Sequence, residues 1–411
     1  MPQALLSPSP LTASLGSGSA FGLLCACSVA RPAAKRAERI AEWQFADFDW
    51  EEFFRIAEHH GVLALAARNL LDYATGLPSE VQSTLESVYA ANFRRSLWFA
   101  AELTRVTRHF EQKRIRAIPY KGPALAQSAY GDLALRSFND LDLLIAPADF
   151  FHAKNALAEI GYQPSKPLDP AVERFWLRHG YECSFDGPAG RHLLELQWAL
   201  LPHFYAVDPR GIDFDDLWAR SGRIDLGNDE NSLGPFHHEG AACLSPEDSL
   251  LVLALHAAKH LWTRLIWVAD IAQTLAMPNL NLALLIKRAR ALGLARILGV
   301  NLWLAGNLLH AAAAPAAQEL IDADPEIPAI GQDSIARLAA CASYSLESAA
   351  YFRQVARLRE RRRDRQRYLW LLASTPGEGE LAVARLPEPM FLLYRGVRMA
   401  RLLRRLVSSK R

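Results

Sequence analysis

Cysteine is scarce in this sequence, and the few cysteines are scattered. The chain of 411 residues contains five: Cys25, Cys27, Cys183, Cys243 and Cys341. Their number is odd and no CxxC pair occurs, so neither a disulfide framework nor a thiolate zinc site is indicated. Scattered free thiols are typical of a reducing compartment, and we therefore expect a cytoplasmic protein.

Long hydrophobic runs and a strong net charge are missing as well. No apolar run reaches the roughly 18 residues that a membrane-spanning helix needs. The apolar stretch FGLLCACSVA at 21–30 has no Lys or Arg before it, so it lacks the basic start of a signal peptide, and we expect an ordinary helix there. The formal net charge is only +2, so the charge of the whole chain points to no class of partner.

The pattern of helical and strand-like segments divides the chain into five parts. The first part is rich in Pro, Ser and Gly, and the third contains short alternating runs typical of strands. We predict a disordered tail (1–19), an N-terminal helical module (20–112), a mixed α/β core (113–225), a second helical module (244–320) and a basic C-terminal helical region (330–411). The predicted fold class is α+β and mostly helical, with a mixed-sheet core flanked by helical modules.

Two aspartates lie one residue apart in the strand-like run NDLDLLI. Because strand side chains alternate, Asp140 and Asp142 point to one face while Leu141 and Leu143 point to the other. Burying two like charges is costly unless a cation compensates them. Mg²⁺ takes its oxygen ligands from one or two carboxylates plus substrate phosphates. The pair therefore predicts an Mg²⁺ site, which Mn²⁺ could also fill.

A third carboxylate lies on another candidate strand, HLLELQW. If this strand lies beside the first, Glu195 could be a further metal ligand or the base that takes a proton from an acceptor. The alternative is a water-exposed acid at the edge of the sheet.

The segment YKGPALA has features of a phosphate-binding turn. Gly122 lets the backbone approach a ligand closely, and Pro123 suits the first position of a helix whose free N–H groups attract anions. Lys121 adds a positive charge. Arg136, four residues before Asp140, could pair with the carboxylates or contact a phosphate. An ordinary strand-to-helix turn is the alternative for the whole segment.

Together these residues resemble a known family. Lys121-Gly122, Tyr130, Arg136 and DLDLLI at 140–145 look like the signature of the uncharacterised bacterial nucleotidyltransferase family, which is similar to the DNA polymerase beta superfamily. The segments DWEEFFRIAEHHGV, ELQW and HAAKHLWTRLIWVADIA resemble further parts of that family, so the likeness covers residues 40 to about 310. It implies a polymerase-beta-like core and a nucleoside triphosphate substrate. Three departures are Gly-Pro where the superfamily usually has Gly-Gly or Gly-Ser, a long spacing from Gly122 to Asp140, and Gln197 where the family often has His.

The last of these segments carries two histidines at helical spacing. His256 and His260 lie at positions i and i+4, a spacing that can bind a metal. With Lys259 between them and no third ligand nearby, we favour a polar face beside the active cleft. On that interpretation Lys259 and Arg264 contact phosphate, and Asp270 forms an ion pair or a cap.

The predicted function is Mg²⁺-dependent transfer of a nucleoside monophosphate from a nucleoside triphosphate to an unknown hydroxyl or phosphate acceptor, with Asp140, Asp142 and Glu195 at the catalytic centre. Two alternatives stay open. One is a catalytically degenerate scaffold that binds nucleotide or a partner. The other is RNA or DNA binding through residues 353–367, which contain eight arginines. Those helices could also make weak contact with a membrane surface, or simply present a solvated face.

Overall fold

The computed structural model confirms the predicted fold class. It describes residues 19–30, 34–190, 192–205, 207–208, 210–226, 240–311, 314–345, 348–377, 380–381 and 386–408. The model is 65% helical and contains a mixed five-stranded sheet, so it is α+β and mostly helical. The predicted disordered tail lies outside the described residues except for Ser19, whose side chain caps the first helix.

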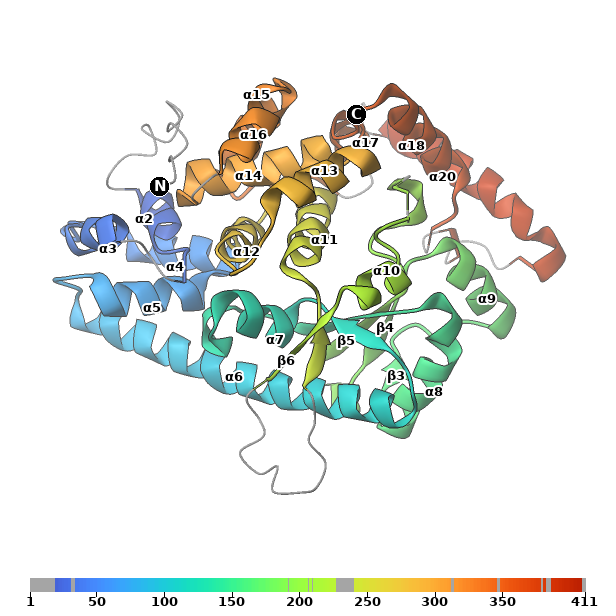
Figure 1. Ribbon diagram of the computed structural model, residues 1–411, viewed down its shortest axis with the longest axis horizontal. Helices are drawn as coiled ribbons and strands as arrows, with labels where there is room; N and C mark the ends of the chain where they lie inside the picture. The colour runs from blue at the N-terminus through green and yellow to red at the C-terminus, as the bar shows by residue number, and fades with distance from the viewer. Residues whose placement is uncertain are drawn as a thin grey trace.

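The N-terminal part is a set of helices joined by short turns. They are α2 (Ala20–Ala26), α3 (Ala34–Ala41), α4 (Trp50–His59), α5 (Leu63–Tyr73) and α6 (Ser79–Gln112). The Asp49 side chain caps α4 by accepting a hydrogen bond from the backbone N–H of Glu52. Gly61 then adopts a left-handed φ of 70°, which turns the chain into α5. The long helix α6 runs beneath the sheet (Figure 1).

The sheet has the strand order β1-β2-β5-β4-β3. Its strands are β1 (Ala117–Pro119), β2 (Asp140–Ile145), β3 (Gln163–Pro164), β4 (Glu182–Asp186) and β5 (Leu193–Gln197). The central pair, β2 and β5, is parallel, while β1–β2, β5–β4 and β4–β3 are antiparallel. The predicted strands in NDLDLLI and HLLELQW are thus confirmed. The helices and the two-stranded ribbon within this part are α7 (Gly122–Leu125), a π-helical turn (Ala126–Tyr130), α8 (Phe150–Glu159), α9 (Pro170–His179), α10 (Phe214–Ala219), β6 (Gly222–Ile224) and β7 (Ala241–Cys243).

Alternation along β2 separates an apolar face from a polar one. Leu141 and Leu143 are buried in one cluster with Phe99 and Leu103 of α6, so this face of the sheet packs on the long helix. Leu144 points the other way and lies in a cluster with Val252. The face that carries the aspartates is therefore the one turned toward the later helices.

The C-terminal half is helical again. Its helices are α11 (Pro246–Lys259), α12 (Leu265–Leu275), α13 (Leu282–Leu292), α14 (Ala295–Leu309), α15 (Pro315–Asp322), α16 (Glu326–Ala339), α17 (Ala349–Arg357), α18 (Arg362–Ser374) and α20 (Tyr394–Ser408). Ser245 caps α11, and its hydroxyl accepts a hydrogen bond from the backbone N–H of Asp248. No helix within the described ranges has the length and apolarity needed to cross a bilayer.

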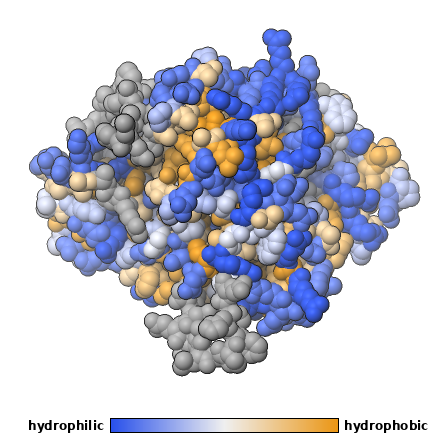
Figure 2. Space-filling view, in the orientation of Figure 1, coloured by the Kyte–Doolittle hydropathy of each residue, from blue (hydrophilic) through white to orange (hydrophobic). Residues whose placement is uncertain are grey.

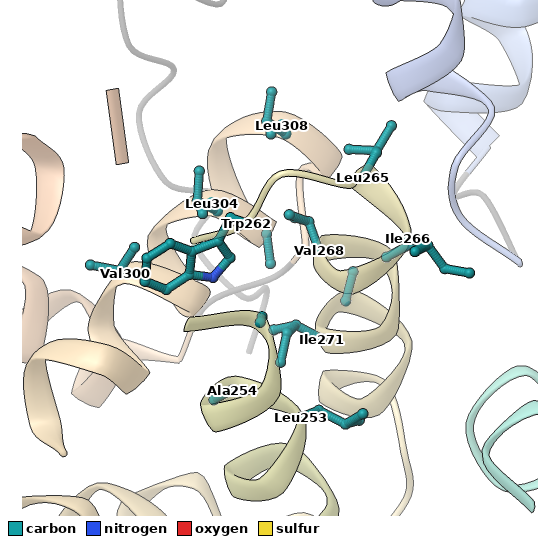
Figure 3. Packing of buried hydrophobic residues seen from close by; sticks show 14 of the residues in the cluster. Leu253, Ala254, Trp262, Leu265, Ile266, Val268, Ile271, Val300, Leu304 and Leu308 are labelled. Carbon is teal, nitrogen blue, oxygen red and sulfur yellow. The ribbon is translucent and has the colours of Figure 1, made fainter. Parts of the chain in front are cut away.

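One hydrophobic cluster joins the N-terminal helices to the later ones. It contains Phe53 and Leu65 together with Leu253 and Leu304. Figure 3 shows Trp262 in this cluster among apolar side chains of α11, α12 and α14, and its indole N–H donates to Asn301 at 2.9 Å. The closely packed helices thus form a support above the sheet.

The face of the molecule in Figure 2 is mostly hydrophilic, and hydrophobic side chains gather over the region of α13 and α14.

Candidate active site

Four carboxylates from three adjacent strands share the polar face of the sheet. Asp140 and Asp142 lie on β2, and the register places Glu195 of β5 directly opposite Asp142. The antiparallel pairing of β4 and β5 places Glu182 opposite Gln197, on the same face. Asp142 is only 2% exposed. The condition for Glu195 to join the aspartates, a strand lying beside theirs, is therefore met.

Gln197 links three of these acids through one amide group. The Tyr120 hydroxyl donates to Gln197 Oε1 at 2.6 Å, which turns the amide nitrogen toward the carboxylates. That nitrogen lies 3.1 Å from Glu195, 3.3 Å from Glu182 and 3.4 Å from Asp142. An amide group has only two N–H bonds to share among three carboxylates. The acids are therefore held together but remain short of donors.

Lys121 supplies the closest positive charge. Its Nζ lies 2.7 Å from Asp142 Oδ1, and both side chains are buried. Gly122 follows with a left-handed φ of 56°, and a Cβ there would lie 3.4 Å from the backbone oxygen of Asp140. A glycine thus lets this turn pass close to the start of β2. The predicted helix after it is a four-residue α-helical turn followed by a π-helical turn.

The charges on this face do not balance. Burial, reinforced by Asp142, raises the pKa of Asp140 and raises the pKa of Glu195 to about 8. Burial also raises the pKa of Glu182, although Lys259 opposes the shift. Lys259 reaches the same region, since its Nζ lies 3.1 Å from the Tyr181 hydroxyl. With all four carboxylates ionised, this face would carry two more negative charges than its two ammonium groups balance, which is the charge that one divalent cation would neutralise.

The donor atoms suit a hard cation. Asp142 Oδ2 is buried and has no hydrogen-bond partner among the described residues, and such an orphaned oxygen is costly unless something binds it. No group of three His, Cys, Asp or Glu side chains in the described ranges forms a ready-made metal site. Mg²⁺ does not require one, because it is usually held by one or two carboxylates and completes its shell with waters and phosphate oxygens.

A second buried acid lies close by and is fully paired. Arg136 donates through Nε and Nη2 to the two oxygens of Asp270 at 2.8 and 2.9 Å. The Tyr130 hydroxyl donates to Asp270 at 2.7 Å. The expected ion pair of Asp270 is confirmed. The guanidinium of Arg136 is held by Asp270 instead of pairing with the aspartates of β2, and its predicted phosphate contact stays a prediction.

His256 of α11 and His260, the residue that follows this helix, form part of an aromatic cluster. The rings of His256 and His260 lie 4.8 Å apart, and His260 stacks on Trp267, also at 4.8 Å. Burial and the neighbouring Lys259 lower the pKa of His260 to about 3, so this ring is neutral. Arg264 is exposed at the start of α12, and its charge acts on His260 rather than on the carboxylates. Its contact with phosphate stays a prediction.

Two members of the cluster were not identified from the sequence. Glu182 lies on β4, and its place beside the other acids depends on the register of the β4–β5 hairpin, which pairs it with Gln197. Counting pairs outward from the turn between the strands would have indicated it. The contact of Tyr120 with Gln197 has no sequence signal, because it joins residues far apart in the chain.

The arginine-rich segment, residues 353–367, is shared between two helices, α17 and α18. Several of its arginines are paired with acids or buried. Arg357 pairs with Glu326 at 2.5 Å and Asp333 at 2.7 Å, and Arg359 is 1% exposed. The exposed arginines of the segment are Arg353, Arg362, Arg363, Arg365 and Arg367. Of these, Arg363 lies 3.6 Å from Asp364 and Arg365 donates to the backbone oxygen of Arg359 at 3.4 Å, and all five are exposed enough to be reached by a polyanion.

Comparison with known proteins gives one match. A family model described as "Uncharacterised nucleotidyltransferase" matches residues 46–310, which is more than half of the chain and contains every candidate site residue. No curated protein and no solved structure matches the chain.

Proposed function

Because the chain belongs to the uncharacterised nucleotidyltransferase family, we propose that it transfers a nucleoside monophosphate from a nucleoside triphosphate to a hydroxyl or phosphate acceptor, with Mg²⁺ or Mn²⁺ as cofactor. The observation that best supports the proposal is the buried Oδ2 of Asp142, which has no hydrogen-bond partner among the residues that the structure describes and belongs to the residue opposite Glu195. A buried acid that lies among like charges indicates a functional site in which a bound cation neutralises it.

In the proposed reaction the acceptor oxygen attacks the α-phosphorus. The new phosphorus–oxygen bond forms, the bond between the α-phosphorus and the bridging oxygen breaks, and pyrophosphate leaves. Asp140 and Asp142 would hold the cation, which would neutralise charge on the phosphate oxygens when bound. Lys121 and Lys259 bring positive charge to the same face, and Gly122 leaves room for the triphosphate.

Glu195 is the group that would accept the proton of the acceptor. Its pKa of about 8 means that it is protonated at neutral pH in the free protein. A cation beside Asp142 would favour the ionised carboxylate and so prepare it as a base. The predicted phosphate contacts of Arg136 and Arg264 have less support. Arg136 would have to release Asp270, and Arg264 lies outside the carboxylate cluster.

The test uses each nucleoside triphosphate labelled in its α-phosphate, with Mg²⁺ and cell extract. The native protein should transfer label to an acceptor, and the double variant Asp140→Asn/Asp142→Asn should not. The matched control is Asp215→Asn, which removes an exposed acid paired with Arg116. Full transfer by the double variant would refute the proposal. Binding of nucleotide without transfer by the native protein would instead support the degenerate scaffold.

A further inference from the structure

Lys121 already contacts one oxygen of the carboxylate that a metal ion would bind. Its ammonium group contacts Asp142 Oδ1 at 2.7 Å, while Oδ2 of the same carboxylate has no partner in the described part of the chain. The positive charge of Lys121 also acts on Asp140 and Glu195. The lysine is therefore the main counter-charge of the cluster.

A divalent cation and this ammonium group compete for the same carboxylate. Mg²⁺ binds oxygen at 2.0–2.1 Å, so a metal on Asp142 would lie only a few ångströms from Lys121, and their charges would repel in a buried site. The protein offers no ready-made group of three ligands among its described residues to outweigh that repulsion. Metal binding by the protein alone should be weak.

A triphosphate would resolve the competition. A lysine ammonium on its flexible stem is a point charge that binds phosphate well, and Lys121 directly precedes the glycine that gives the backbone room. The phosphates would draw the ammonium away from Asp142 and would themselves supply the missing metal ligands.

We propose that Lys121 makes metal binding depend on the nucleotide: its ammonium group occupies Asp142 in the empty site and moves to the triphosphate when metal and nucleotide arrive together. This inference rests on the nucleotidyl transfer proposed above. Lys121 is in this account a specificity-determining residue, because it keeps the site from holding a metal ion without its substrate.

The test measures Mn²⁺ binding by the electron paramagnetic resonance signal of free Mn²⁺. Lys121→Met removes the charge and keeps an unbranched side chain only one atom shorter. It should bind Mn²⁺ alone at least about 10-fold more tightly than the native protein, because the competing charge is gone. A purely structural role for Lys121 would have the opposite effect, since loss of packing weakens a site. The control is Lys113→Met, which removes an exposed lysine paired with Glu159 and should bind Mn²⁺ as the native protein does. Equal or weaker binding by Lys121→Met would refute the inference.

A second measurement uses the native protein, in case the variant does not fold. Mn²⁺ is titrated with and without each nucleoside triphosphate that carries a methylene group between the α- and β-phosphorus, and protein-free mixtures give the background. The affinity for Mn²⁺ should rise at least about 10-fold with the analogue that binds. Equal affinity for Mn²⁺ with and without the analogue would refute the movement of Lys121 from Asp142 to the triphosphate and would leave the transferase proposal intact. If the double variant Asp140→Asn/Asp142→Asn bound Mn²⁺ in the presence of the analogue as tightly as the native protein does, this inference and the transferase proposal would both fail.

Discussion

Two buried aspartates near the sheet, Asp142 and Asp270, are equally hidden but differently paired. Both oxygens of Asp270 bind Arg136, and Tyr130 adds a third hydrogen bond. Asp142 has Lys121 and the Gln197 amide on one oxygen and no hydrogen-bond partner on the other within the described part of the chain, with further acids beside it. A fully satisfied buried acid is what a stable fold requires, whereas an unsatisfied one among like charges is explained by ligand binding. The comparison therefore separates a structural acid from a functional one.

The largest expected effect is on transfer when Asp142 alone is changed. Asp142→Asn should lower the rate of label transfer by at least about 10³-fold, because the oxygens that hold the cation are lost. Its midpoint of urea unfolding should shift less than that of Asp270→Asn, since Lys121 keeps Asp140 and Glu195 as neighbouring acids when Asp142 loses its charge. If Asp142→Asn unfolded at a lower urea concentration than the native protein and still transferred label normally, Asp142 would be a structural acid.

For Asp270 we expect the reverse pattern. Asp270→Asn breaks a buried ion pair and leaves Arg136 uncompensated, so the free energy of unfolding should fall by about 3–5 kcal/mol. Urea unfolding followed by circular dichroism measures it. Asp208→Asn, which breaks an exposed pair with Arg210, should change the same quantity by less than about 1 kcal/mol. Similar losses in the two variants would contradict the structural assignment.

We also expect the stability of the protein to depend on pH through His60, which contacts the helix that carries Asp270. This buried ring accepts a hydrogen bond from the backbone N–H of Leu265, and burial together with His59 lowers its pKa to about 4. The unfolded chain binds a proton near pH 6.5 and the folded chain does not. Stability is therefore full above pH 6.5 and falls by up to about 3 kcal/mol as the pH drops toward 4. In urea titrations at several pH values, His60→Gln should reduce the dependence of the free energy of unfolding on pH. An unchanged dependence would contradict this role of His60.

Gly122 offers a smaller perturbation of the functional site. Its left-handed backbone makes any side chain unfavourable, so Gly122→Ala should cost about 1–2 kcal/mol of unfolding free energy. Because the Cβ would also approach the backbone of Asp140, transfer should fall as well. Gly76→Ala has a similar φ and open surroundings, and it should show the stability loss with normal transfer. Normal transfer in Gly122→Ala would mean that this turn does not shape the site.

The smallest effect is expected from the exposed arginines of α18. Replacing Arg363, Arg365 and Arg367 by Gln should change stability by less than about 0.5 kcal/mol, as is usual for surface positions. Label transfer should not change. If the native protein bound RNA or DNA with an affinity that falls steeply with salt, and the triple variant did not, the nucleic-acid alternative would gain its support.

The sequence predicted the elements of the site better than its contacts. Alternation in NDLDLLI placed Asp140 and Asp142 on one face, and the adjacent strand brought in Glu195. Periodicity acts locally, so it predicts faces and caps but not which strands become neighbours. Glu182 was missed because it depends on register, and the pairing of Arg136 with Asp270 was missed because it joins residues 134 positions apart. Contacts of that kind arise only from tertiary packing.

The most direct measurement compares two positions of the label in the same nucleoside triphosphate. With the native protein, Mg²⁺ and cell extract, label from the α-phosphate should appear on the acceptor, and label from the γ-phosphate should leave as pyrophosphate in equal amount. Appearance of the γ-label on the acceptor would show phosphoryl transfer instead. That result would contradict nucleotidyl transfer at the carboxylate cluster.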